Sequence, residues 1–587
     1  MENVSILAGT GVISANGGAG SGAAAGGGGG GRIAVVCLSN NFTGQLTASG
    51  GNGTYPGGAG TIYIFVTQEG GGKTLLVDNG GLMGANTPLS SDFWLPTALF
   101  DLDISGGATV VPLTPLPVLS DLNLGTNSTL TLPIEQTNLF VAVLQNASLA
   151  GNLNVDRLGF GQTNGPGPGT SIANKGSGGG YGGNGGASST GAPGGTNYGS
   201  ATEPVDFGSG GGAGEDTATG GSEGGGALRL SVAGNLTVNG NVSANGDAGL
   251  QDDSGGGAGG SVWITAGTLT GTGDFSALGG NGVLFGGGGG GGGRIAIYAP
   301  TNDFTGTTNA AGGGGASPGQ PGSVFLSSTL PNFQVVSQSP TGLVLNTVSQ
   351  VFLSFSEAVA PASVYASTFT LNTPEGTLDP SSISAVPAGP ATVCVSFPTQ
   401  NVPGDYSIGA PVTLSSIFGA PLAQPFAGGF TVSVPTISGQ VTGTNGAPVA
   451  GVLVQPDGGL IGSTTDTNGD YSIGVPPGWN GAVTPSLGSD MFVPPSLSYT
   501  NVTAPLTGQD YLMAPTVAPT VGSSLVGTNL TLNWLGIPGV SYQLWWSPDL
   551  VNWQALGSPV IGTNGPMQIA LPLDLGPAAF FQVGATP

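Results

Sequence analysis

Short alternations of apolar and polar residues, separated by glycine or proline, recur along the whole chain. Residues 235–243 read Asn-Leu-Thr-Val-Asn-Gly-Asn-Val-Ser, so that every second side chain is apolar on either side of a glycine turn. A two-residue period places the apolar side chains on one face of a strand. The residues between the turns are rich in Val, Ile, Thr, Leu and Phe, which suit pleated, half-buried surfaces. The pattern predicts an all-β protein built from short strands.

The N-terminal part contains an internal repeat, in which residues 1–65 match residues 263–327 without gaps. The clearest matches are Arg32-Ile33-Ala34 with Arg294-Ile295-Ala296, and Phe42-Thr43-Gly44 with Phe304-Thr305-Gly306. Strand-like starts also recur at Leu228, Val262, Ile295 and Val324, at spacings of 34, 33 and 29 residues. Repeats of this length with several short strands each are typical of stacked coils. We therefore expect a right-handed parallel β-helix over residues 1–330.

Glycine tracts at residues 26–31, 165–226 and 286–293 interrupt this pattern. They fit either flexible loops that leave the helix or ordered polyglycine strands packed on its flank. Low side-chain content favours flexible loops, because glycine loses more backbone entropy on ordering than any other residue.

The composition changes after Pro331, where glycine becomes less frequent and proline and β-branched residues become more frequent. Three segments of 70 to 100 residues follow, at 333–434, 436–513 and 516–587. Each has the length and the strand density of one small β-sandwich. We expect three such modules in a row.

The first of these segments resembles a bacterial immunoglobulin-like module of the S-layer type. The resemblance rests on Ser-Gln-Ser-Pro at 337–340, Val-Phe-Leu-Ser-Phe-Ser-Glu-Ala-Val at 351–359 and Gly-Asp-Tyr-Ser-Ile at 404–408. It covers the whole segment and implies a β-sandwich.

The other two segments resemble further secreted modules. With Ile-Ser-Gly-Gln-Val at 437–441 and Thr-Thr-Asp-Thr-Asn-Gly-Asp-Tyr-Ser-Ile at 464–473, residues 436–513 resemble the carboxypeptidase-regulatory-like, transthyretin-type sandwich. That resemblance implies a structural appendage without catalysis. Residues 516–587 look like a fibronectin-III-like module, through Leu-Thr-Leu-Asn-Trp at 530–534 and Ser-Pro-Asp-Leu-Val-Asn-Trp at 547–553. Together the resemblances imply a secreted or cell-surface bacterial protein.

The charge of the chain excludes several classes of partner. Its 587 residues include 30 acidic and 6 basic side chains, for a net charge of −24, and no Lys or Arg follows Arg294. Nucleic acids and anionic membranes require clustered cations, so neither is expected as a partner. No apolar run reaches the roughly 18 residues of a membrane span, so no membrane insertion is expected. The chain has no histidine, the side chain most used for acid–base catalysis near neutral pH.

The cysteines and the first residues bear on where the protein works. Cys37 and Cys394 lie in segments of different character, so we expect two buried, unpaired thiols rather than a disulfide. Residues 1–18 lack the basic and apolar stretches of a signal peptide and read like the middle of a repeat. We expect a fragment of a longer protein that is extracellular or exposed on the bacterial cell surface.

Carboxylates on neighbouring coils are the main candidates for chemistry. Asp101, Asp103 and Asp121 are expected on adjacent strands, where they could bind Ca²⁺ or polarise a sugar. With Arg157 they define the alternative function, a β-helix polysaccharide lyase or glycoside hydrolase with its site on the N-terminal rod. The Gly-His-Gly and Arg-Ile-Lys motifs of galacturonases are absent. We interpret the three carboxylates as part of an Asp/Asn ladder on the outer face, and predict no catalytic residue.

Two other motifs lack a necessary element. Asp466-Thr467-Asn468-Gly469-Asp470 begins like a calcium-binding loop, but Pro477 stands at the twelfth position, where a bidentate Glu is required. The glycine tracts lack the Lys-Ser/Thr ending of a phosphate-binding loop. We therefore predict no metal site and no cofactor.

One aromatic residue is a candidate ligand contact. In the strand-like run 542–546, alternation places Tyr542, Leu544 and Trp546 on one face and directs Trp545 outward, where it could stack on a sugar or touch a partner. The sequence thus favours a non-enzymatic extracellular structural or adhesive protein. Its rod and sandwich modules would contact glycans or matrix, or self-associate into fibres through the β-helix ends.

Overall fold

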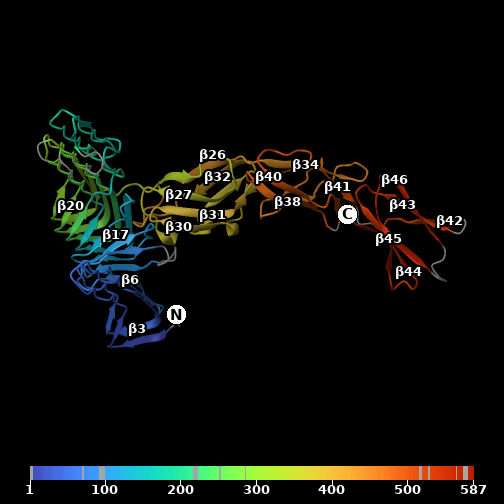
Figure 1. Cartoon of the computed structure of the whole chain (residues 1–587), viewed down its shortest axis with the longest axis horizontal. Helices are drawn as coiled ribbons and strands as arrows, with labels where there is room; N and C mark the ends of the chain where they lie inside the picture. The colour runs from blue at the N-terminus through green and yellow to red at the C-terminus, as the bar shows by residue number, and fades with distance from the viewer. Residues whose placement is uncertain are drawn as a thin grey trace.

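The regular secondary structure of the protein is almost entirely β-strand. The computed structural model describes residues 4–68, 72–90, 99–215, 222–249, 253–283, 286–488, 490–514, 519–526, 529–563, 565–572 and 579–586. The helices among them are 3₁₀ turns, at Pro361–Ser363, Ala366–Thr368 and Pro380–Ser382. Within the described ranges, no helix has the length and apolar character needed to cross a membrane. Figure 1 shows stacked N-terminal sheets and a row of smaller sheets that extends away from them.

A sheet of thirteen strands runs through the N-terminal part. In spatial order its main path is β1 (Val4–Gly9), β3 (Arg32–Phe42), β5 (Thr61–Val66), β6 (Lys73–Asp78), β8 (Asp101–Ser105), β10 (Leu122–Leu124), β13 (Ala147–Leu149), β17 (Ala227–Val238), β19 (Ser261–Gly271), β21 (Arg294–Tyr298) and β24 (Ser323–Ser327). β12 (Asn138–Val143) pairs with β17, and β22 (Thr301–Phe304) pairs with β19. The pairs are parallel except β5 with β6, which are antiparallel. The expectation of parallel pairing throughout is wrong at that point.

In a second sheet of seven strands, successive chain segments contribute their strands in the same spatial order as in the first. We call each segment that contributes a strand to both sheets a coil. Its strands are β23 (Thr307–Asn309), β20 (Asp274–Ser276), β18 (Asn241–Ser243), β14 (Asn152–Asn154), β11 (Thr129–Leu130), β9 (Thr109–Pro112) and β7 (Asn86–Leu89). Two small sheets pair β2 (Val12–Ser14) with β4 (Gln45–Thr47), and β15 (Ser171–Ile172) with β16 (Lys175–Gly176).

The spacing of apolar residues explains why these strands stack in register. Leu228 pairs with Val262, Val262 with Ile295, and Ile295 with Val324, as their recurrence in the sequence predicts. Side chains at alternate positions of these strands enter one continuous hydrophobic core, which extends from Ala59 to Ala310. Burial of such aliphatic side chains contributes about 25 cal/mol per Å² of apolar surface, so each coil is stabilised by the coils beside it.

The described glycine tracts are ordered and lie against one another. In the tract 286–293, residues three apart face the same neighbouring segment. A Cβ atom added to any glycine of 287–293 would lie 1.9 to 2.1 Å from a carbonyl oxygen of a neighbouring segment. For Gly287, Gly290 and Gly293 that segment is 254–260. For Gly288 and Gly291 it is 183–186, and for Gly289 and Gly292 it is 310–313. A threefold repeat of neighbours is the geometry of a polyproline-II-like chain, which has three residues per turn and no internal hydrogen bonds.

The backbone hydrogen bonds of this tract have the same threefold period. The N–H groups of Gly288 and Gly291 donate to the carbonyl oxygens of Gly176 and Gly179. Those of Gly289 and Gly292 donate to Ser317 and Gln320, and those of Gly290 and Gly293 donate to Gly280 and Ala277. We call this array of segments 176–195, 208–214, 254–260, 277–282, 286–293 and 310–322 the glycine bundle. It corresponds to ordered packing on the flank, so the flexible-loop interpretation is wrong for the described residues. Residues 216–221 of the long tract lie outside them.

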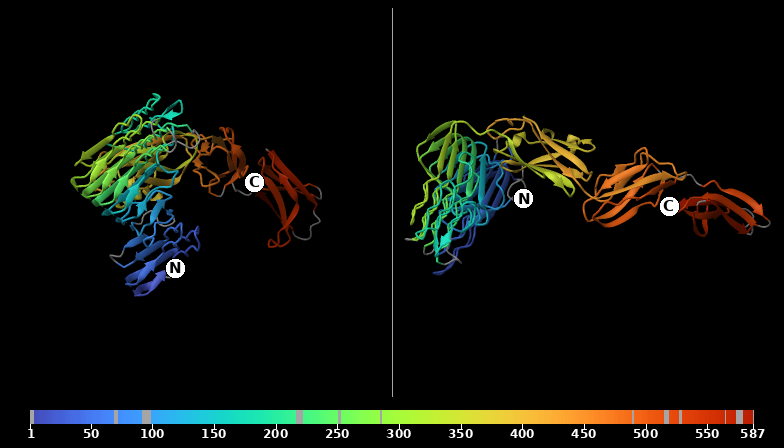
Figure 2. Two further views of the ribbon diagram at one scale, coloured as in Figure 1. Left: turned by 60° about the vertical axis from the view of Figure 1, so that its left-hand side comes forward. Right: turned by 90° about the horizontal axis from the view of Figure 1, so that it is seen from above.

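Three further regions each consist of two facing sheets, which are successive in Figure 2. Segment 333–434 contains β25 (Val335–Ser339), β27 (Val348–Phe355), β31 (Thr392–Gln400) and β30 (Ser384–Gly389) in one sheet. Its other sheet contains β26 (Gly342–Val344), β33 (Phe426–Val432), β32 (Gly404–Ala410), β28 (Thr370–Thr373) and β29 (Gly376–Thr377). The side chains between the two sheets form a separate hydrophobic cluster that includes Leu353, Val395 and Ile408.

The last two regions repeat this arrangement with smaller sheets. Residues 436–514 contain β37 (Asp470–Gly474), β34 (Thr436–Gly443), β41 (Tyr511–Ala514) and β39 (Met491–Val493), facing β36 (Ser463–Thr464), β35 (Leu453–Pro456), β38 (Trp479–Ser486) and β40 (Leu497–Val502). Residues 519–586 contain β42 (Gly522–Val526), β43 (Asn529–Gly536) and β46 (Gly565–Pro572), facing β45 (Gln554–Ile561), β44 (Ser541–Ser547) and β47 (Phe580–Thr586). Each region has its own hydrophobic cluster.

Candidate functional surfaces

A shallow polar groove crosses the outer face of the thirteen-stranded sheet where β10, β13 and β17 lie side by side. It has a volume of about 480 Å³ and is lined by Asp121, Leu122, Asn123, Asn146, Ala147, Ser148, Asn235 and Thr237. The alternation of these strands turns the polar residues outward, while Leu122 and Ala147 face the core. Parallel pairing in register then aligns amide, hydroxyl and carboxylate groups in rows about 4.8 Å apart. Such rows offer repeated hydrogen-bond donors and acceptors to an extended polar ligand.

Of the three predicted carboxylates, Asp121 lines the groove, and Asp101 and Asp103 lie on the neighbouring strand β8. Asp103 pairs in register with Asn123, whose Nδ2 donates to Asp103 Oδ1 at 3.1 Å. Asp121 Oδ1 accepts the backbone N–H of Asn146 at 2.9 Å. Burial raises the pKa of Asp103, the hydrogen bond from Asn123 opposes this shift, and the charge of Asp78 adds to it. The structure thus has the predicted Asp/Asn ladder. Asp101 directly precedes Leu102 on β8, just as Asp121 directly precedes Leu122, the register partner of Leu102 on β10.

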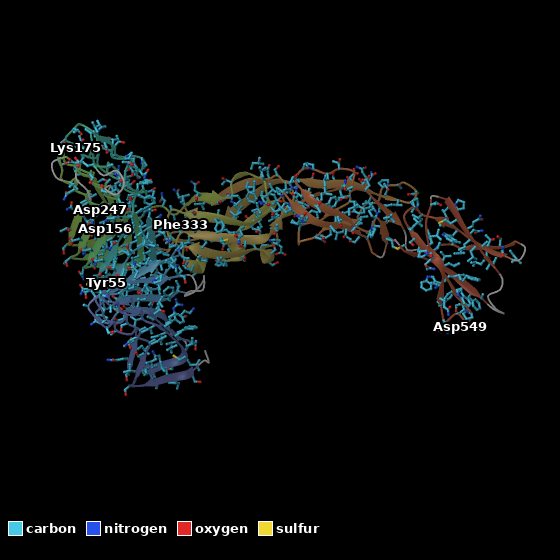
Figure 3. The ribbon with its side chains drawn as sticks, in the orientation of Figure 1. Tyr55, Asp156, Lys175, Asp247, Phe333 and Asp549 are labelled. Carbon is cyan, nitrogen blue, oxygen red and sulfur yellow. The ribbon has the colours of Figure 1, made fainter. Side chains whose placement is uncertain are left out.

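The cation of the alternative enzyme site lies elsewhere. Arg157 forms an ion pair with Asp247, 2.9 Å from Nη2 to Oδ2, and Figure 3 shows Asp156 and Asp247 together on the flank of the coils. Burial raises the pKa of Asp247, while Arg157 lowers it. Other basic side chains are also engaged: Lys175 with Asp253, Lys73 above the Phe65 ring, and Arg294 with the carbonyl of Tyr198. Arg157 therefore pairs with Asp247 rather than with Asp101, Asp103 or Asp121, which the alternative enzyme site requires.

A buried ion pair joins the coils to segment 333–434. Arg229 Nη2 lies 3.1 Å from Glu357 Oε2, and the two side chains are 13% and 3% exposed. The guanidinium lies 3.9 Å from the centre of the Trp263 ring. Ser231 Oγ donates to Glu357 Oε1 at 2.6 Å, so two side chains of β17 hold the carboxylate of segment 333–434. A buried pair costs several kcal/mol to break by removal of one partner, because the other charge stays desolvated.

Apolar packing surrounds this ion pair. Val118, Ala142, Ala358 and Ile417 form a hydrophobic cluster shared by the coils and segment 333–434. Sequence reasoning missed the joint. One signal was available: Glu357 is the only charged residue between Asp303 and Glu375.

A second joint, centred on Asn401, connects segments 333–434 and 436–514. Its side chain is fully buried, and Nδ2 donates to the carbonyl oxygens of Ile461 and Gly474. Its Oδ1 accepts the N–H of Ile461 at 2.7 Å. Because this buried amide of segment 333–434 bonds to the main chain of segment 436–514, moving either segment leaves polar groups unpaired, so Asn401 fixes their relative position.

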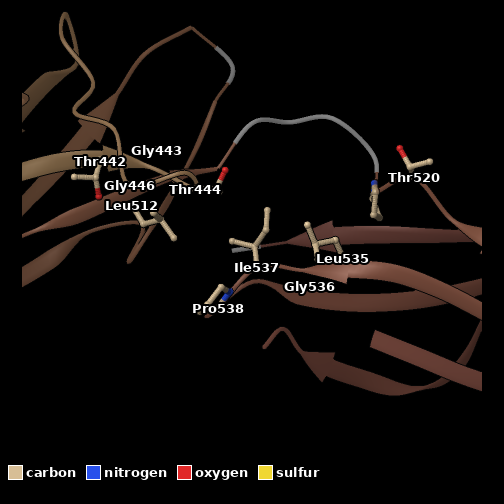
Figure 4. A pocket seen from close by; sticks show the side chains of 11 residues that line it. Thr442, Gly443, Thr444, Gly446, Leu512, Thr520, Leu535, Gly536, Ile537 and Pro538 are labelled. Carbon is tan, nitrogen blue, oxygen red and sulfur yellow. The ribbon is translucent and has the colours of Figure 1, made fainter. Parts of the chain in front are cut away.

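The third connection is more open. A cavity of about 800 Å³ lies between residues 436–514 and 519–586, lined by Thr442, Gly443, Thr444, Gly446, Leu512, Pro519, Thr520, Leu535, Gly536, Ile537 and Pro538 (Figure 4). Val493 contacts the hydrophobic cluster of the last segment. No titratable side chain is among the residues that line the cavity.

Trp545 lies on β44, where Tyr542 and Leu544 are buried as predicted, whereas Trp546, predicted on the same face, is only partly buried. The prediction that Trp545 is solvent-exposed needs correction, since its exposure is intermediate. Its indole lies beside Gly584 of the neighbouring strand β47, 3.5 Å from the position of a Cβ atom there. The ring is therefore in contact with a neighbouring strand and is only partly exposed to solvent.

The remaining sequence motifs have structural roles. Asp466 Oδ1 accepts the backbone N–H groups of Asn468 at 2.8 Å and Asp470 at 3.0 Å, so it closes the turn that leads into β37. Among the described residues, no three His, Cys, Asp or Glu side chains lie close enough together to hold a metal ion. Cys37 and Cys394 are buried and unpaired.

Comparisons with known proteins give only distant likenesses. No family model matches the chain, and no curated protein matches it. Among solved structures, the N-terminal part of the bacterial S-layer protein SbsC is 10% identical over 41% of this chain and 44% of its own, with a TM-score of 0.14. The major pilin subunit BcpA of Bacillus cereus is 8% identical over 33% of this chain and 74% of its own, with a TM-score of 0.14. Domains of Escherichia coli alpha-2-macroglobulin are 9% identical over 44% of this chain and 97% of their own, with a TM-score of 0.16. At these scores the likeness identifies neither a family nor a function.

Proposed function

We propose that the chain is a non-enzymatic structural and adhesive protein, extracellular or exposed on a bacterial cell surface. In this proposal the two N-terminal sheets are faces of a right-handed parallel β-helix. The three two-sheet segments are an immunoglobulin-like, a transthyretin-type and a fibronectin-III-like sandwich. The parallel registers of the coils and the separate hydrophobic cluster of each segment support this division.

The observation that carries the proposal is the joint at Arg229 and Glu357. A spacer requires neighbouring modules to keep a fixed direction, whereas modules joined by a polar linker move relative to one another. The joint buries an ion pair and an apolar cluster between the coils and segment 333–434, and Asn401 fixes the next connection. Arg157, Lys175 and Arg229 form ion pairs with Asp247, Asp253 and Glu357 rather than with the carboxylates of the ladder, which favours a rod over an enzyme.

Glycans or matrix polymers are the proposed ligands. The polar groove beside Asp121 and the half-open ring of Trp545 supply the two contact types that bind sugars, hydrogen bonds from aligned polar groups and stacking on an aromatic face.

The stiffness of the rod is tested by small-angle X-ray scattering on the full chain. Arg229→Ala should cost about 3–5 kcal/mol at the joint, because Glu357 then stays buried without its partner. The scattering curve should change from that of one rigid body to that of a flexible pair. Arg157→Ala, which removes an ion pair with a half-exposed guanidinium, is the matched control. It should change neither the stability of the joint nor the scattering curve. An unchanged curve for Arg229→Ala would contradict the rigid joint.

A panel of acidic and neutral polysaccharides tests the non-enzymatic part, with binding and release of reducing ends read in parallel. Binding without turnover is expected, and Asp121→Ala should weaken it if the groove is the contact. Turnover that is lost in Asp101→Ala or Asp121→Ala would establish the alternative, a polysaccharide lyase or glycoside hydrolase.

A further inference from the structure

β24 is an open edge of the thirteen-stranded sheet. It pairs with β21, and no other described strand pairs with it. The N–H of Ser323 donates to Gly293, and the carbonyl of Ser327 accepts from Ala299. Because bonding directions alternate along a parallel strand, Ser323, Phe325 and Ser327 use their backbone groups toward β21. The N–H and C=O groups of Val324 and Leu326 therefore point to the free edge.

The same two residues expose the hydrophobic core at this end of the coils. Their register partners on β21, Ile295 and Ile297, are 0% and 1% exposed. Val324 and Leu326 are 43% and 58% exposed, although they stand on the same core face. A core row thus ends in two apolar side chains with no strand beside them among the described residues.

The internal repeat indicates what kind of strand covers such an edge. At the offset of 262 residues, β5 is the counterpart of β24, and Ile62 and Ile64 correspond to Val324 and Leu326. In the first copy, β6 pairs with β5 antiparallel and places Leu76 opposite Ile62. Ile62 is only 1% exposed as a result. The counterpart of the open edge is therefore closed by an antiparallel strand with an apolar residue opposite it.

The sequence around β24 has no charge that would oppose pairing. Residues 304–356 contain no Asp, Glu, Lys or Arg, although the whole chain carries a net charge of −24. In natural proteins, charged residues, proline or a bulge usually protect an edge strand from association with other chains. Residues 323–327 have no charge and no proline. Two copies can therefore approach through this edge without charge repulsion from the strand itself.

We propose that β24 pairs antiparallel with β24 of a second copy of the chain, with Val324 of each copy opposite Leu326 of the other. This register brings the free backbone groups of both strands together as hydrogen-bonded pairs and continues the apolar row across a twofold axis. Phe325 then faces its own counterpart, beside Tyr298. This proposal names the self-association surface of the rod and rests on the proposed structural function.

Analytical ultracentrifugation of the full chain tests the pairing. The wild type should form a concentration-dependent dimer. Leu326→Pro removes one N–H per copy from the free edge and keeps the bonds to β21, because the N–H at this position points away from that strand. Its dimer should be weaker by about tenfold or more, since two interchain hydrogen bonds are lost. Leu343→Pro, at an exposed apolar position near the start of the next segment, is the matched control and should dimerise normally.

Cross-linking tests the register independently of stability. Phe325→Cys places two thiols on the twofold axis, in a non-hydrogen-bonded pair with a Cα separation of about 4.5 Å, which a disulfide can span. Mild oxidation should give a covalent dimer, whereas Val336→Cys, at a position 57% exposed on β25, should not. A monomeric wild type, an unaffected Leu326→Pro dimer, or equal cross-linking of both cysteine variants would overturn the proposal. If the wild type is monomeric but its scattering curve is that of a rigid body, the pairing proposal fails and the proposed function stands.

Discussion

The glycine bundle and segment 333–434 are ordered by opposite means. In the bundle, the main chains approach so closely that a Cβ atom on most of the glycines would overlap a neighbouring carbonyl, and each chain is held by hydrogen bonds to several others. In segment 333–434, the strands are held apart by large side chains such as Phe369 and Phe333, which fill the space between the two sheets. The first region depends on the absence of side chains and the second on their size.

The difference teaches that a low side-chain content does not determine whether a tract is ordered. The entropy cost of fixing glycine is large, at the upper end of the roughly 1–2 kcal/mol per residue for backbone ordering. In the bundle this cost is offset by backbone hydrogen bonds that are shielded from water, with N–H groups of 286–293 satisfied by three different segments in turn. Side-chain burial contributes little to the ordering of the bundle, whereas it is the main contribution in segment 333–434.

The largest predicted effect is on the bundle. Gly290→Ala would place a Cβ atom 2.0 Å from the carbonyl oxygen of Gly257, and the backbone of segment 254–260 cannot retreat without breaking its own hydrogen bonds. We expect a loss of about 4 kcal/mol or more, measured by hydrogen exchange of the bundle amides. Gly161→Ala, where the added Cβ has no neighbour within 4 Å, should change protection by less than about 0.5 kcal/mol. Equal effects of the two substitutions would show that the bundle is not close-packed.

A smaller effect is expected when a side chain is removed from segment 333–434. Leu353 is fully buried between the sheets, so Leu353→Ala should cost about 3 kcal/mol through lost burial and the cavity that remains. Exchange protection should fall in that segment and stay unchanged in the bundle. Leu343→Ala, at a side chain 65% exposed, serves as the control. A comparable loss in both variants would mean that the two sheets do not share a packed core.

The smallest effect concerns one of the few large side chains in the bundle. Burial raises the pKa of Tyr181 to about 12 from the ordinary value of 10.0, and its hydroxyl lies 2.7 Å from Ser261 Oγ. The folded state therefore holds this proton more tightly than the unfolded state, and stability falls as the pH rises from 10 toward 12. We expect Tyr181 to contribute a loss of about 1 kcal/mol between pH 10 and 11, seen as a lower melting temperature.

Tyr181→Phe should remove that part of the alkaline dependence, at a cost of about 1 kcal/mol for the lost hydrogen bond. Tyr55→Phe, at a side chain 72% exposed, should leave the alkaline melting curve unchanged. An identical alkaline dependence in the wild type and in Tyr181→Phe would show that the hydroxyl is not buried as described.

How much the sequence predicts depends on whether side chains determine the structure. The coil register was predictable, because apolar residues such as Leu228 and Val262 recur at the spacing of the strands. The interpretation of Asp101, Asp103 and Asp121 as an outer ladder follows from the same alternation. Trp545 was placed on the correct strand, but its partial burial involves contact with Gly584 of a neighbouring strand, which alternation cannot reveal.

The glycine bundle was harder to predict, because a polyglycine-like tract has no alternation to read. One signal was available: tracts such as 254–260 and 286–293 each stand directly before a strand that begins a new coil. Their recurrence in step with the coils indicates that they stack as the coils do. The joint at Arg229 and Glu357 required knowledge of which surfaces meet, and no local pattern carries that information.

The placement of the basic residues also determines how the protein meets proteases that cut after Lys or Arg. Beyond Arg294 the chain offers them no cleavage site, so residues 295–587 form one uninterrupted piece. Arg294 is itself 8% exposed, and Arg229 is enclosed between the coils and the next segment. Such a protease can trim the N-terminal part at the more accessible Arg157. It can detach the three C-terminal segments only after the coils that surround Arg229 and Arg294 have opened, so their retention is governed by the stability of the coils.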